Sequence, residues 1–343
     1  MQSMRLHAPR DMRLDDVPAP EPGPGEALIR VRAVGVCGSD VHYFVDGHIG
    51  ATQAPYPFVL GHEGAGEIAA LGPGVKGLPV GTRVAIDPAI PCGRCEVCLE
   101  GNPNCCPDVR FPSTPPLPGM LSEWFVHPAR LCIPLPEALD FTAGAMLEPL
   151  GVVVHALALA RLRPADTVAI LGAGPIGVLA MQLALNSGAG AVTVSEPIPE
   201  RRALAAELGA TAVCDPSAVD PADWLSDQTG GRGVDVAIEA AWGGAAVEQA
   251  VCMARHAGKV VLVGIPRDDR VTYPANVARR KGLTILMSRR MKHVYPRAMA
   301  LIERRVVDVR AVVTHRFPLA RAAQAFELVA SLQDGVVKAM VEL

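Results

Sequence analysis

This 343-residue sequence has almost no excess charge, no long hydrophobic run and no internal repeat. Its 32 lysine and arginine residues oppose 35 aspartate and glutamate residues, which leaves a net charge of -3. A balance this even provides no basic surface for nucleic acid or for an acidic membrane. These absences favour a protein whose partner is a small molecule.

Neither a secretory signal nor a membrane span is expected. Arg5, Arg10 and Arg13 interrupt the apolar residues at the N-terminus, so a signal peptide's apolar core has no room there. The longest apolar stretches, such as residues 151–160, are far too short to cross a bilayer. We therefore expect a cytoplasmic protein, in which clustered cysteines more often bind metal than form disulfides.

The chain is long enough for two domains that each bury a core. The first 150 residues combine many glycines and prolines with short β-like runs, at 27–34, 66–70 and 83–86. This texture predicts an irregular, β-rich domain. From about Pro164 the pattern changes to alternating strand-like and helix-like segments.

Short valine- and isoleucine-rich runs occupy residues 167–171, 191–195, 234–240 and 259–264. Helix-like segments lie between them at residues 176–186, 199–208 and 245–254. This alternation predicts an α/β fold with a doubly wound parallel sheet. Beyond about Thr284 the pattern is mixed, and its periodicity does not decide whether the tail extends the second domain or returns to the first.

A glycine-rich turn, Gly172-Ala173-Gly174-Pro175-Ile176-Gly177, follows the first of these strands and opens a helix. The first glycine allows a tight turn, the second lets the backbone approach a pyrophosphate, and the third packs the helix against the strand. Free N–H groups at the helix N-terminus would bind the phosphates. An ordinary strand-to-helix turn is the alternative, and the strand, the helix and the acid that follows weigh against it.

That acid is Glu196, which ends the next strand about 20 positions after the turn. Its carboxylate would accept hydrogen bonds from the adenosine ribose hydroxyls, so NAD is favoured over NADP. Arg201 and Arg202 follow closely and could receive the 2'-phosphate of NADP, but Glu196 would repel that group.

Cys92, Cys95 and Cys98 follow one another at three-residue steps, and Cys105 and Cys106 come soon after. Four thiolates on one compact loop can close a tetrahedral zinc site with no open position. Free or disulfide-bonded thiols are the alternative, which the lack of secretory features disfavours. The spacing does not decide whether Cys105 or Cys106 is the fourth ligand.

A second set of candidate ligands is scattered along the chain and comprises Cys37, His62, Glu63 and Glu148. A thiolate, an imidazole and a carboxylate, with one position left for water or substrate, suit a catalytic zinc ion. The spacing alone is weak evidence, because each of these residues would by itself more often be structural.

Together these motifs resemble the zinc-containing medium-chain dehydrogenases, most closely the polyol branch of sorbitol and xylitol dehydrogenases. The resemblance covers nearly the whole chain. Its further carriers are Cys37-Gly38-Ser39-Asp40-Val41-His42-Tyr43, Gly61-His62-Glu63-Gly64-Ala65-Gly66-Glu67, Thr114-Pro115-Pro116, Glu148-Pro149-Leu150 and residues 313–319. It implies that residues 1–150 form a GroES-like catalytic zinc domain to which residues 285–343 return. It also implies that residues 151–284 form an NAD-binding Rossmann domain, and that the protein is a homodimer or homotetramer.

The resemblance implies two zinc ions per subunit. Cys37, His62 and Glu63 would bind the catalytic ion, and Glu148 would bind it directly or hold its water. The implied ligands of the structural ion are Cys92, Cys95, Cys98 and Cys106. The implied cofactor-binding residues are Gly172, Gly174, Pro175, Ile176, Gly177, Glu196 and Arg201.

Ser39 and His42 match the family's proton-relay positions. Ser39 would take the proton of the alcohol, and His42 would pass it towards solvent. The alternative for Ser39 is a turn hydroxyl that caps the following helix.

The implied reaction transfers a hydride between a secondary alcohol and NAD, with a polyol such as sorbitol or xylitol giving the ketose. Tyr43 and Phe111 match pocket aromatics of the polyol enzymes, and Arg290 matches their substrate-binding arginine. Met291 departs from the pattern, because those enzymes carry tyrosine there, and a surface ion pair is the alternative role for Arg290. The metal ligands do not separate this reaction from oxidation of 2,3-butanediol or threonine. A nucleotide-binding or zinc-stabilised protein without catalysis is disfavoured, because it would lack Cys37, His62 or Glu63, and all three are present.

Overall fold

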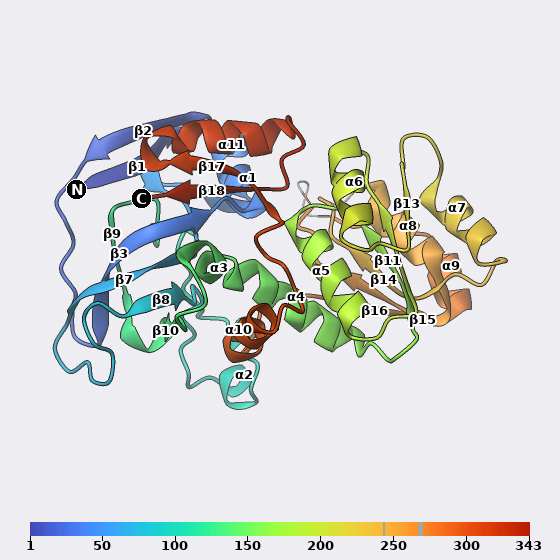
Figure 1. The fold of residues 1–343 in the computed structure, drawn as a ribbon, viewed down its shortest axis with the longest axis horizontal. Coiled ribbons are helices and arrows are strands. Elements are labelled where there is room, and N and C mark those ends of the chain that lie inside the picture. Colours follow the sequence, from blue (N-terminus) through green and yellow to red (C-terminus); the bar gives the residue numbers. More distant parts are fainter. Residues whose placement is uncertain (243, 267–269) are drawn as a thin grey trace. The chain divides into compact units, whose positions relative to one another are not determined.

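The computed structural model describes residues 1–242, 244–266 and 270–343, which form two compact units (Figure 1). Unit 1 comprises Met1–Pro149, Tyr295–Glu303 and Val309–Leu343, and unit 2 comprises Leu150–Val294 and Arg304–Asp308. The returning C-terminal segment, expected from residue 285, thus begins at Tyr295 in the structure.

Unit 1 is built on a seven-stranded sheet. Its strands are β10 (Cys132–Pro134), β8 (Arg83–Ile86), β7 (Glu63–Leu71), β3 (Glu26–Gly35), β18 (Lys338–Glu342) and β17 (Val313–Pro318) in spatial order, with β9 (Trp124–Pro128) also paired to β3. The C-terminal strand β18 runs antiparallel to β3, with Met340 opposite Gly35. This pairing fixes the tail within unit 1.

Short elements surround that sheet. A three-stranded sheet contains β2 (Asp11–Asp16), β1 (Gln2–Ala8) and β6 (Phe58–Val59), and a small hairpin contains β4 (His48–Ile49) and β5 (Thr52–Gln53). The helices of unit 1 include α1 (Gly38–Asp46), α2 (Glu96–Leu99), α3 (Phe141–Ala145), α10 (Tyr295–Glu303) and α11 (Ala322–Ser331). Phe44 of α1 packs on Phe326 of α11 with ring centroids 5.5 Å apart, and both rings are buried. Helix α1 is therefore held against the C-terminal helix by the core.

Unit 2 is a six-stranded parallel sheet. In spatial order its strands are β13 (Ala212–Cys214), β12 (Ala191–Ser195), β11 (Thr167–Leu171), β14 (Val234–Glu239), β15 (Ala254–Leu262) and β16 (Thr284–Met287). The chain crosses to one side of β11 and then to the other, which confirms the doubly wound α/β fold predicted from the sequence. Ligands of such sheets bind where the order reverses, at the carboxyl end of the strands.

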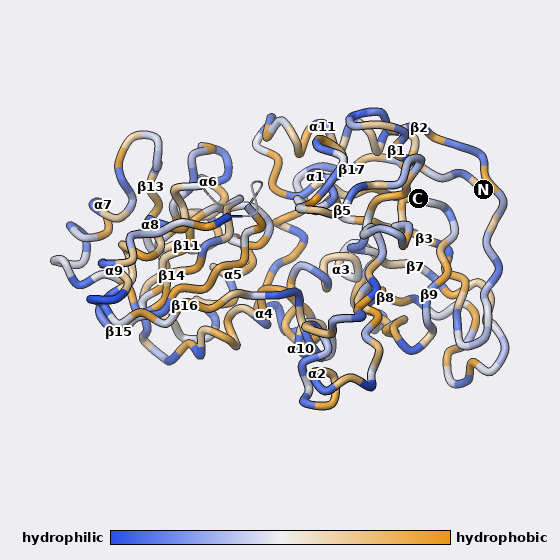
Figure 2. Tube along the Cα trace, turned by 180° about the vertical axis from the view of Figure 1, so that it is seen from behind, coloured by the Kyte–Doolittle hydropathy of each residue, from blue (hydrophilic) through white to orange (hydrophobic). Residues whose placement is uncertain are grey.

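Helices cover both faces of this sheet (Figure 1). Helices α5 (Pro175–Asn186) and α6 (Pro199–Glu207) pack on β11, β12 and β13. Helices α7 (Pro221–Gln228), α8 (Ala245–Met253) and α9 (Ala275–Lys281) share a second core with the sheet, which includes Leu171, Leu225, Val251 and Val260. The central strands carry hydrophobic colouring along their length (Figure 2). Helix α4 (Leu147–Ala160) precedes β11, and none of the helices within the described residues is long and apolar enough to cross a membrane.

Strand β16 is an edge strand that the sequence pattern did not predict. Its residues pair with β15 in parallel, with Leu286 opposite Val261. The mixed pattern after Thr284 hides this strand because an edge strand is only partly buried. Its pairing keeps residues 284–287 in unit 2, which is why the return to unit 1 begins later than expected.

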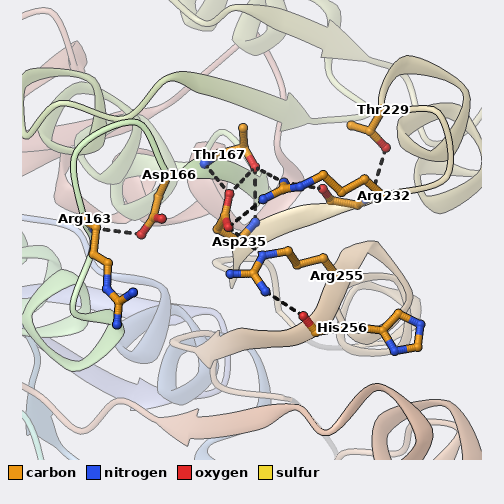
Figure 3. Close-up of polar contacts among 9 residues, drawn as sticks. Arg163, Asp166, Thr167, Thr229, Arg232, Asp235, Arg255 and His256 are labelled. Atoms are coloured by element: carbon orange, nitrogen blue, oxygen red, sulfur yellow. Dashed lines mark hydrogen bonds and ion pairs between the residues drawn. The ribbon is translucent and has the colours of Figure 1, made fainter.

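A buried carboxylate joins the starts of three segments in unit 2 (Figure 3). Asp235 Oδ2 accepts hydrogen bonds from Thr167 N at 2.9 Å and from Thr167 Oγ1 at 2.8 Å. Its Oδ1 accepts from Arg232 Nη2 at 2.9 Å and from Arg255 Nε at 2.6 Å. Burial by itself would raise the pKa of Asp235, but these hydrogen bonds outweigh it and hold the pKa well below its usual value. The network lies at the amino end of β11 and β14, opposite the ligand-binding edge, and its role is structural.

Candidate active site and cysteine cluster

In unit 1 Cys37 meets two adjacent residues, His62 and Glu63. Cys37 is the residue before α1, Glu63 is the first residue of β7, and His62 directly precedes it. Their ligand atoms all lie within 4.8 Å of one another. His62 and Glu63 are buried, and Cys37 is partly exposed. Thiolate, imidazole and carboxylate at this spacing fit the donor set of a zinc ion with an open position.

Gly61 makes the turn that aims His62 into this site. Its φ of 96° lies in the left-handed region, and a Cβ there would lie 2.8 Å from Val34 Cγ1. A side chain at position 61 would therefore clash with β3 and displace the backbone that carries His62.

Asp40, one turn into α1, is the hydrogen-bond partner of His62. Its Oδ1 lies 3.1 Å from His62 Nδ1, and the carboxylate is 1% exposed. Burial by itself would lower the pKa of His62, but the neighbouring acidic groups of Asp40 and Cys37 outweigh it and raise the pKa. Such a carboxylate orients a ligating imidazole and fixes its tautomer. Asp40 lies within the Cys37–Tyr43 motif, whose spacing did not predict this contact with His62.

Lys338 is a second residue that sequence reasoning missed. Its Nζ lies 2.8 Å and 2.6 Å from the two carboxylate oxygens of Glu63, and it also donates to the carbonyl oxygen of Val36 at 3.1 Å. Both charged side chains are 2% exposed. The signal was the single lysine at the start of β18, between Val337 and the apolar residues 339–341, since a buried ammonium group needs a counter-ion.

Glu148 lies in the first turn of α4 and is 5% exposed. Burial raises its pKa to about 7, with His62 opposing the rise and Glu63 adding to it. Glu148 thus interacts electrostatically with His62 and Glu63. It is outside the group of residues whose ligand atoms lie within 4.8 Å of one another. The structure thus brings Cys37, His62 and Glu63 together and leaves Glu148 beside them.

The two residues predicted to relay protons lie on α1. Ser39 Oγ donates to Cys37 Sγ at 3.4 Å, so the hydroxyl faces the ligand set. His42 Nδ1 lies 3.7 Å from Asp46 Oδ2, and side-chain exposure rises from 8% at His42 to 17% at Asp46. The three residues follow one face of the helix from the ligand set towards solvent.

The predicted substrate residues have different surroundings. Phe111 lies beside the ligand set, with its ring centroid 5.1 Å from that of His62. Tyr43 is 2% exposed and lies in the apolar core, where it meets Phe58 edge-on. Arg290 belongs to unit 2, where its φ is 51°, and its substrate-binding role stays a prediction.

The cysteine loop forms a compact cluster. The Sγ atoms of Cys92, Cys95, Cys98 and Cys106 lie within 4.8 Å of one another, while Cys105 is exposed and outside the group. Two Sγ–Sγ distances are 4.0 Å, between Cys92 and Cys98, and 3.9 Å, between Cys95 and Cys106. A zinc–sulfur bond of about 2.3 Å places tetrahedral sulfurs about 3.8 Å apart, so this cluster fits a zinc ion. Backbone N–H groups of Arg94 and Cys95 lower the pKa of the Cys92 thiol to about 6, whereas burial and the neighbouring thiols raise the pKa of Cys98 to about 12.

The glycine-rich turn has the backbone that its sequence predicts. Gly172 has a φ of 100°, Gly174 is the N-cap of α5, and Pro175 is its first residue. A Cβ on Gly177 would lie 1.8 Å from the carbonyl oxygen of Gly172, so only glycine allows this close packing. Ile176 is the second residue of α5, between Pro175 and Gly177.

Glu196 reaches this turn from the end of β12. Its carboxylate accepts hydrogen bonds from Ala173 N at 2.6 Å and from Ile198 N at 3.0 Å. Arg201 is buried, and its Nη1 lies 3.9 Å from the Cβ position of Gly174. Arg202 instead donates to the carbonyl oxygen of Glu196 at 2.7 Å and pairs with Asp215 at 3.0 Å. Arg201 therefore faces the turn, and Arg202 is engaged elsewhere.

Comparison with known proteins gives the family. Residues 23–137 match the alcohol dehydrogenase GroES-like domain, and residues 175–304 match the zinc-binding dehydrogenase family. A sorbitol dehydrogenase of Bacillus subtilis (strain 168) is 36% identical over 341 residues, which span 99% of this chain and 97% of the relative. The chain belongs to the zinc-dependent medium-chain dehydrogenases.

A further relative is also of the polyol branch, and solved structures of other family members have the same fold. A probable D-xylulose reductase A of Arthroderma otae is 39% identical over 331 residues, 95% of this chain and 93% of the relative. A structure of a putative zinc-binding dehydrogenase from Sinorhizobium meliloti 1021 bound to NADP covers all of this chain with a TM-score of 0.92 and 32% identity, across 99% of its own length. A 2R,3R-butanediol dehydrogenase structure from Bacillus subtilis has a TM-score of 0.89 and 28% identity over 100% of this chain and 99% of its own. This zinc-dependent dehydrogenase is thus an oxidoreductase of the branch that the sequence predicts.

Proposed function

We propose that this dehydrogenase oxidises a polyol at a secondary carbon to the ketose and reduces NAD. The observation that carries the proposal is the meeting of Cys37, His62 and Glu63 within 4.8 Å, with the Ser39 hydroxyl beside Cys37. Unit 1 would be the catalytic domain and unit 2 the domain that binds the cofactor. The sorbitol dehydrogenase and xylulose reductase relatives support a polyol as the substrate class.

A zinc ion at these residues would supply Lewis-acid polarisation of the alcohol, and the nicotinamide would accept the hydride. Cys37 and His62 hold their donor atoms towards one point, because α1 and the Gly61 turn are packed against β3 and α11. Ser39 is placed to accept the proton of the substrate hydroxyl, and His42 with Asp46 continues the path outwards. Phe111 packs beside His62, with the two ring centroids 5.1 Å apart.

A kinetic panel tests the proposal. Sorbitol, xylitol, 2,3-butanediol and threonine would each be assayed with NAD and with NADP. We expect the largest kcat/KM for a polyol with NAD. A larger value for butanediol or threonine would replace the polyol assignment, and turnover of none of them would remove it.

The NAD preference rests on Glu196, whose carboxylate lies at the Gly172–Gly177 turn. An NADP phosphate next to this carboxylate would be repelled. Glu196→Ala is expected to lower the ratio of kcat/KM with NAD to kcat/KM with NADP. Glu200→Ala on the exposed face of α6 is the matched control and should leave this ratio unchanged. Wild-type kcat/KM that is equal or better with NADP would bring Arg201 forward as a phosphate ligand.

Arg290 is the proposed contact for a substrate hydroxyl. A guanidinium has five donors, and a simple aliphatic alcohol would leave more of them unpaired than a polyol does. Arg290→Ala should therefore raise KM for polyols far more than KM for a simple secondary alcohol. Equal increases in both would mean that the arginine is structural.

A second candidate function is oxidation of 2,3-butanediol, which the similarity to the butanediol dehydrogenase structure favours. Met291 also weakens the polyol pattern, because it offers no hydroxyl to a long substrate. The same kinetic panel separates the two candidates by their kcat/KM values. Arg290→Ala adds a second test, since it should raise KM less for a substrate with fewer hydroxyl groups.

We further propose a cytoplasmic homodimer or homotetramer. Strand β16 is the edge strand of the parallel sheet within the described residues, and Met287 on it is 67% exposed. Such an edge is a template for pairing with another chain. Light scattering of the purified protein would give the mass, and a monomer would contradict the proposal. A reducing compartment suits the thiols of both ligand sets.

A further inference from the structure

Ser113 lies beside the candidate active site and belongs to none of the ligand sets. It is 2% exposed, and its Oγ donates to Asp40 Oδ1 at 2.5 Å. The same Oγ accepts a hydrogen bond from Gly61 N at 3.0 Å. One hydroxyl thus joins α1 to the turn that carries His62.

Both partners of this hydroxyl control His62. Asp40 Oδ1 is also the atom that lies 3.1 Å from His62 Nδ1, so one carboxylate oxygen serves both Ser113 and His62. Gly61 is the residue directly before His62. Ser113 therefore holds the backbone at one end of His62 and the hydrogen-bond partner at the other.

The second carboxylate oxygen of Asp40, Oδ2, gives the carboxylate no further support beyond the bonds of Oδ1 to Ser113 and His62 within the described residues. Asp40 Oδ2 is buried and has no hydrogen-bond partner within the described part of the chain. Without Ser113 the carboxylate would keep only its bond to His62, and the pair could rotate together. The φ of 63° at Ser113 is unfavourable for a residue with a side chain, which indicates that its contacts hold it there.

We propose that Ser113 is a positioning residue that fixes the imidazole of His62 for metal binding, through Asp40 and Gly61. This inference rests on the proposed catalytic zinc site. Hydrogen-bonding partners of a metal's ligands orient the ring and raise affinity, and their loss typically weakens metal binding about 10- to 100-fold. Ser113 acts one bond further out, so the lower end of that range is expected.

The test compares Ser113→Ala and Ser113→Gly with wild type. Alanine removes the hydroxyl and keeps the unfavourable backbone, whereas glycine removes the hydroxyl and relieves it. Ser122→Ala is the matched control, because its Oγ is also buried and its hydrogen-bond partner is Ser3 Oγ, at 2.6 Å, rather than Asp40 or Gly61. The measurements are the affinity and release rate of the labile zinc ion with a chromophoric chelator, and the visible spectrum after cobalt replaces that ion.

We expect both Ser113 variants to bind the labile ion about tenfold more weakly and to alter the cobalt spectrum. The Ser122 variant should match wild type in both measurements. Wild-type affinity in Ser113→Gly alone would assign the effect to backbone strain and overturn the proposal, as would wild-type values in both variants. A wild-type protein with no labile zinc would remove the proposed site itself, and this inference with it.

Discussion

The four-cysteine cluster and the Cys37 site differ in how their residues are gathered. The cysteines come from one loop between residues 92 and 106, and three of the four are partly exposed. Cys37 lies before α1, His62 and Glu63 lie at the start of β7, and the counter-ion Lys338 lies 275 positions beyond Glu63. A local loop can form around a metal with little help from the fold, whereas the second site exists only once β3, β7 and β18 have paired.

The two sites also differ in the chemical type of their metal-binding donor atoms. Four thiols fill a tetrahedral shell and leave nothing for a substrate, which suits a structural ion. Three unlike donors with Ser39 and Glu148 nearby leave an open position, which suits chemistry. Each of the following predictions tests one side of this contrast.

The largest expected effect is on turnover. Cys37→Ser should lower kcat by about a thousandfold or more with the fold intact, because Lewis-acid stabilisation is worth several kcal/mol. Steady-state kinetics and circular dichroism measure the two quantities. Retained turnover would show that Cys37 is not needed for metal-dependent catalysis.

Lys338→Met should act through Glu63, which would become an unpaired buried charge. Breaking such a pair costs about 3–5 kcal/mol of unfolding free energy, and a metal cation at Glu63 would restore part of it. Denaturant unfolding should therefore show a larger loss in chelator-treated protein than in zinc-loaded protein. Equal losses with and without zinc would place the metal away from Glu63.

Cys106→Ser should mainly lower stability, because the cluster ties a loop together without joining the reaction. We expect the thermal midpoint to fall by roughly 5 °C or more, while kcat per active site changes little. Cys105→Ser is the matched control, since Cys105 is exposed and outside the cluster. A similar drop in both variants would mean that Cys105 also contributes to the site.

The smallest expected effect is a difference in the rates at which a chelator removes the two zinc ions. Elemental analysis should give about two zinc ions per subunit, and a chelator should remove one faster than the other, because an open three-ligand site exchanges more readily than a thiolate cage. Activity should fall with the fast phase. A value near one that zinc supplementation does not change would remove one of the two sites.

Several features could be predicted because their signals are local. The glycine turn needs only adjacent residues with particular backbone angles, and strands at 167–171 and 191–195 match the structure residue for residue. The edge strand β16 escaped prediction because half-buried residues lack a continuous apolar run. Glu196 was expected to face the cofactor, and the structure adds its bonds to Ala173 and Ile198, which no sequence pattern records.

The sequence by itself determined the donor types, the two-part organisation of the chain and the glycine turn, because each depends on residue identity and short spacing. Only the tertiary structure decided that Lys338 faces Glu63 and that Ser113 reaches Asp40. The spacing of the cysteines left Cys105 and Cys106 as alternatives, and the structure gathers Cys106 into the cluster. The physical reason is that a hydrogen bond or an ion pair depends on atoms within a few ångströms. Strand pairing across hundreds of residues sets those distances, and spacing along the chain does not encode them.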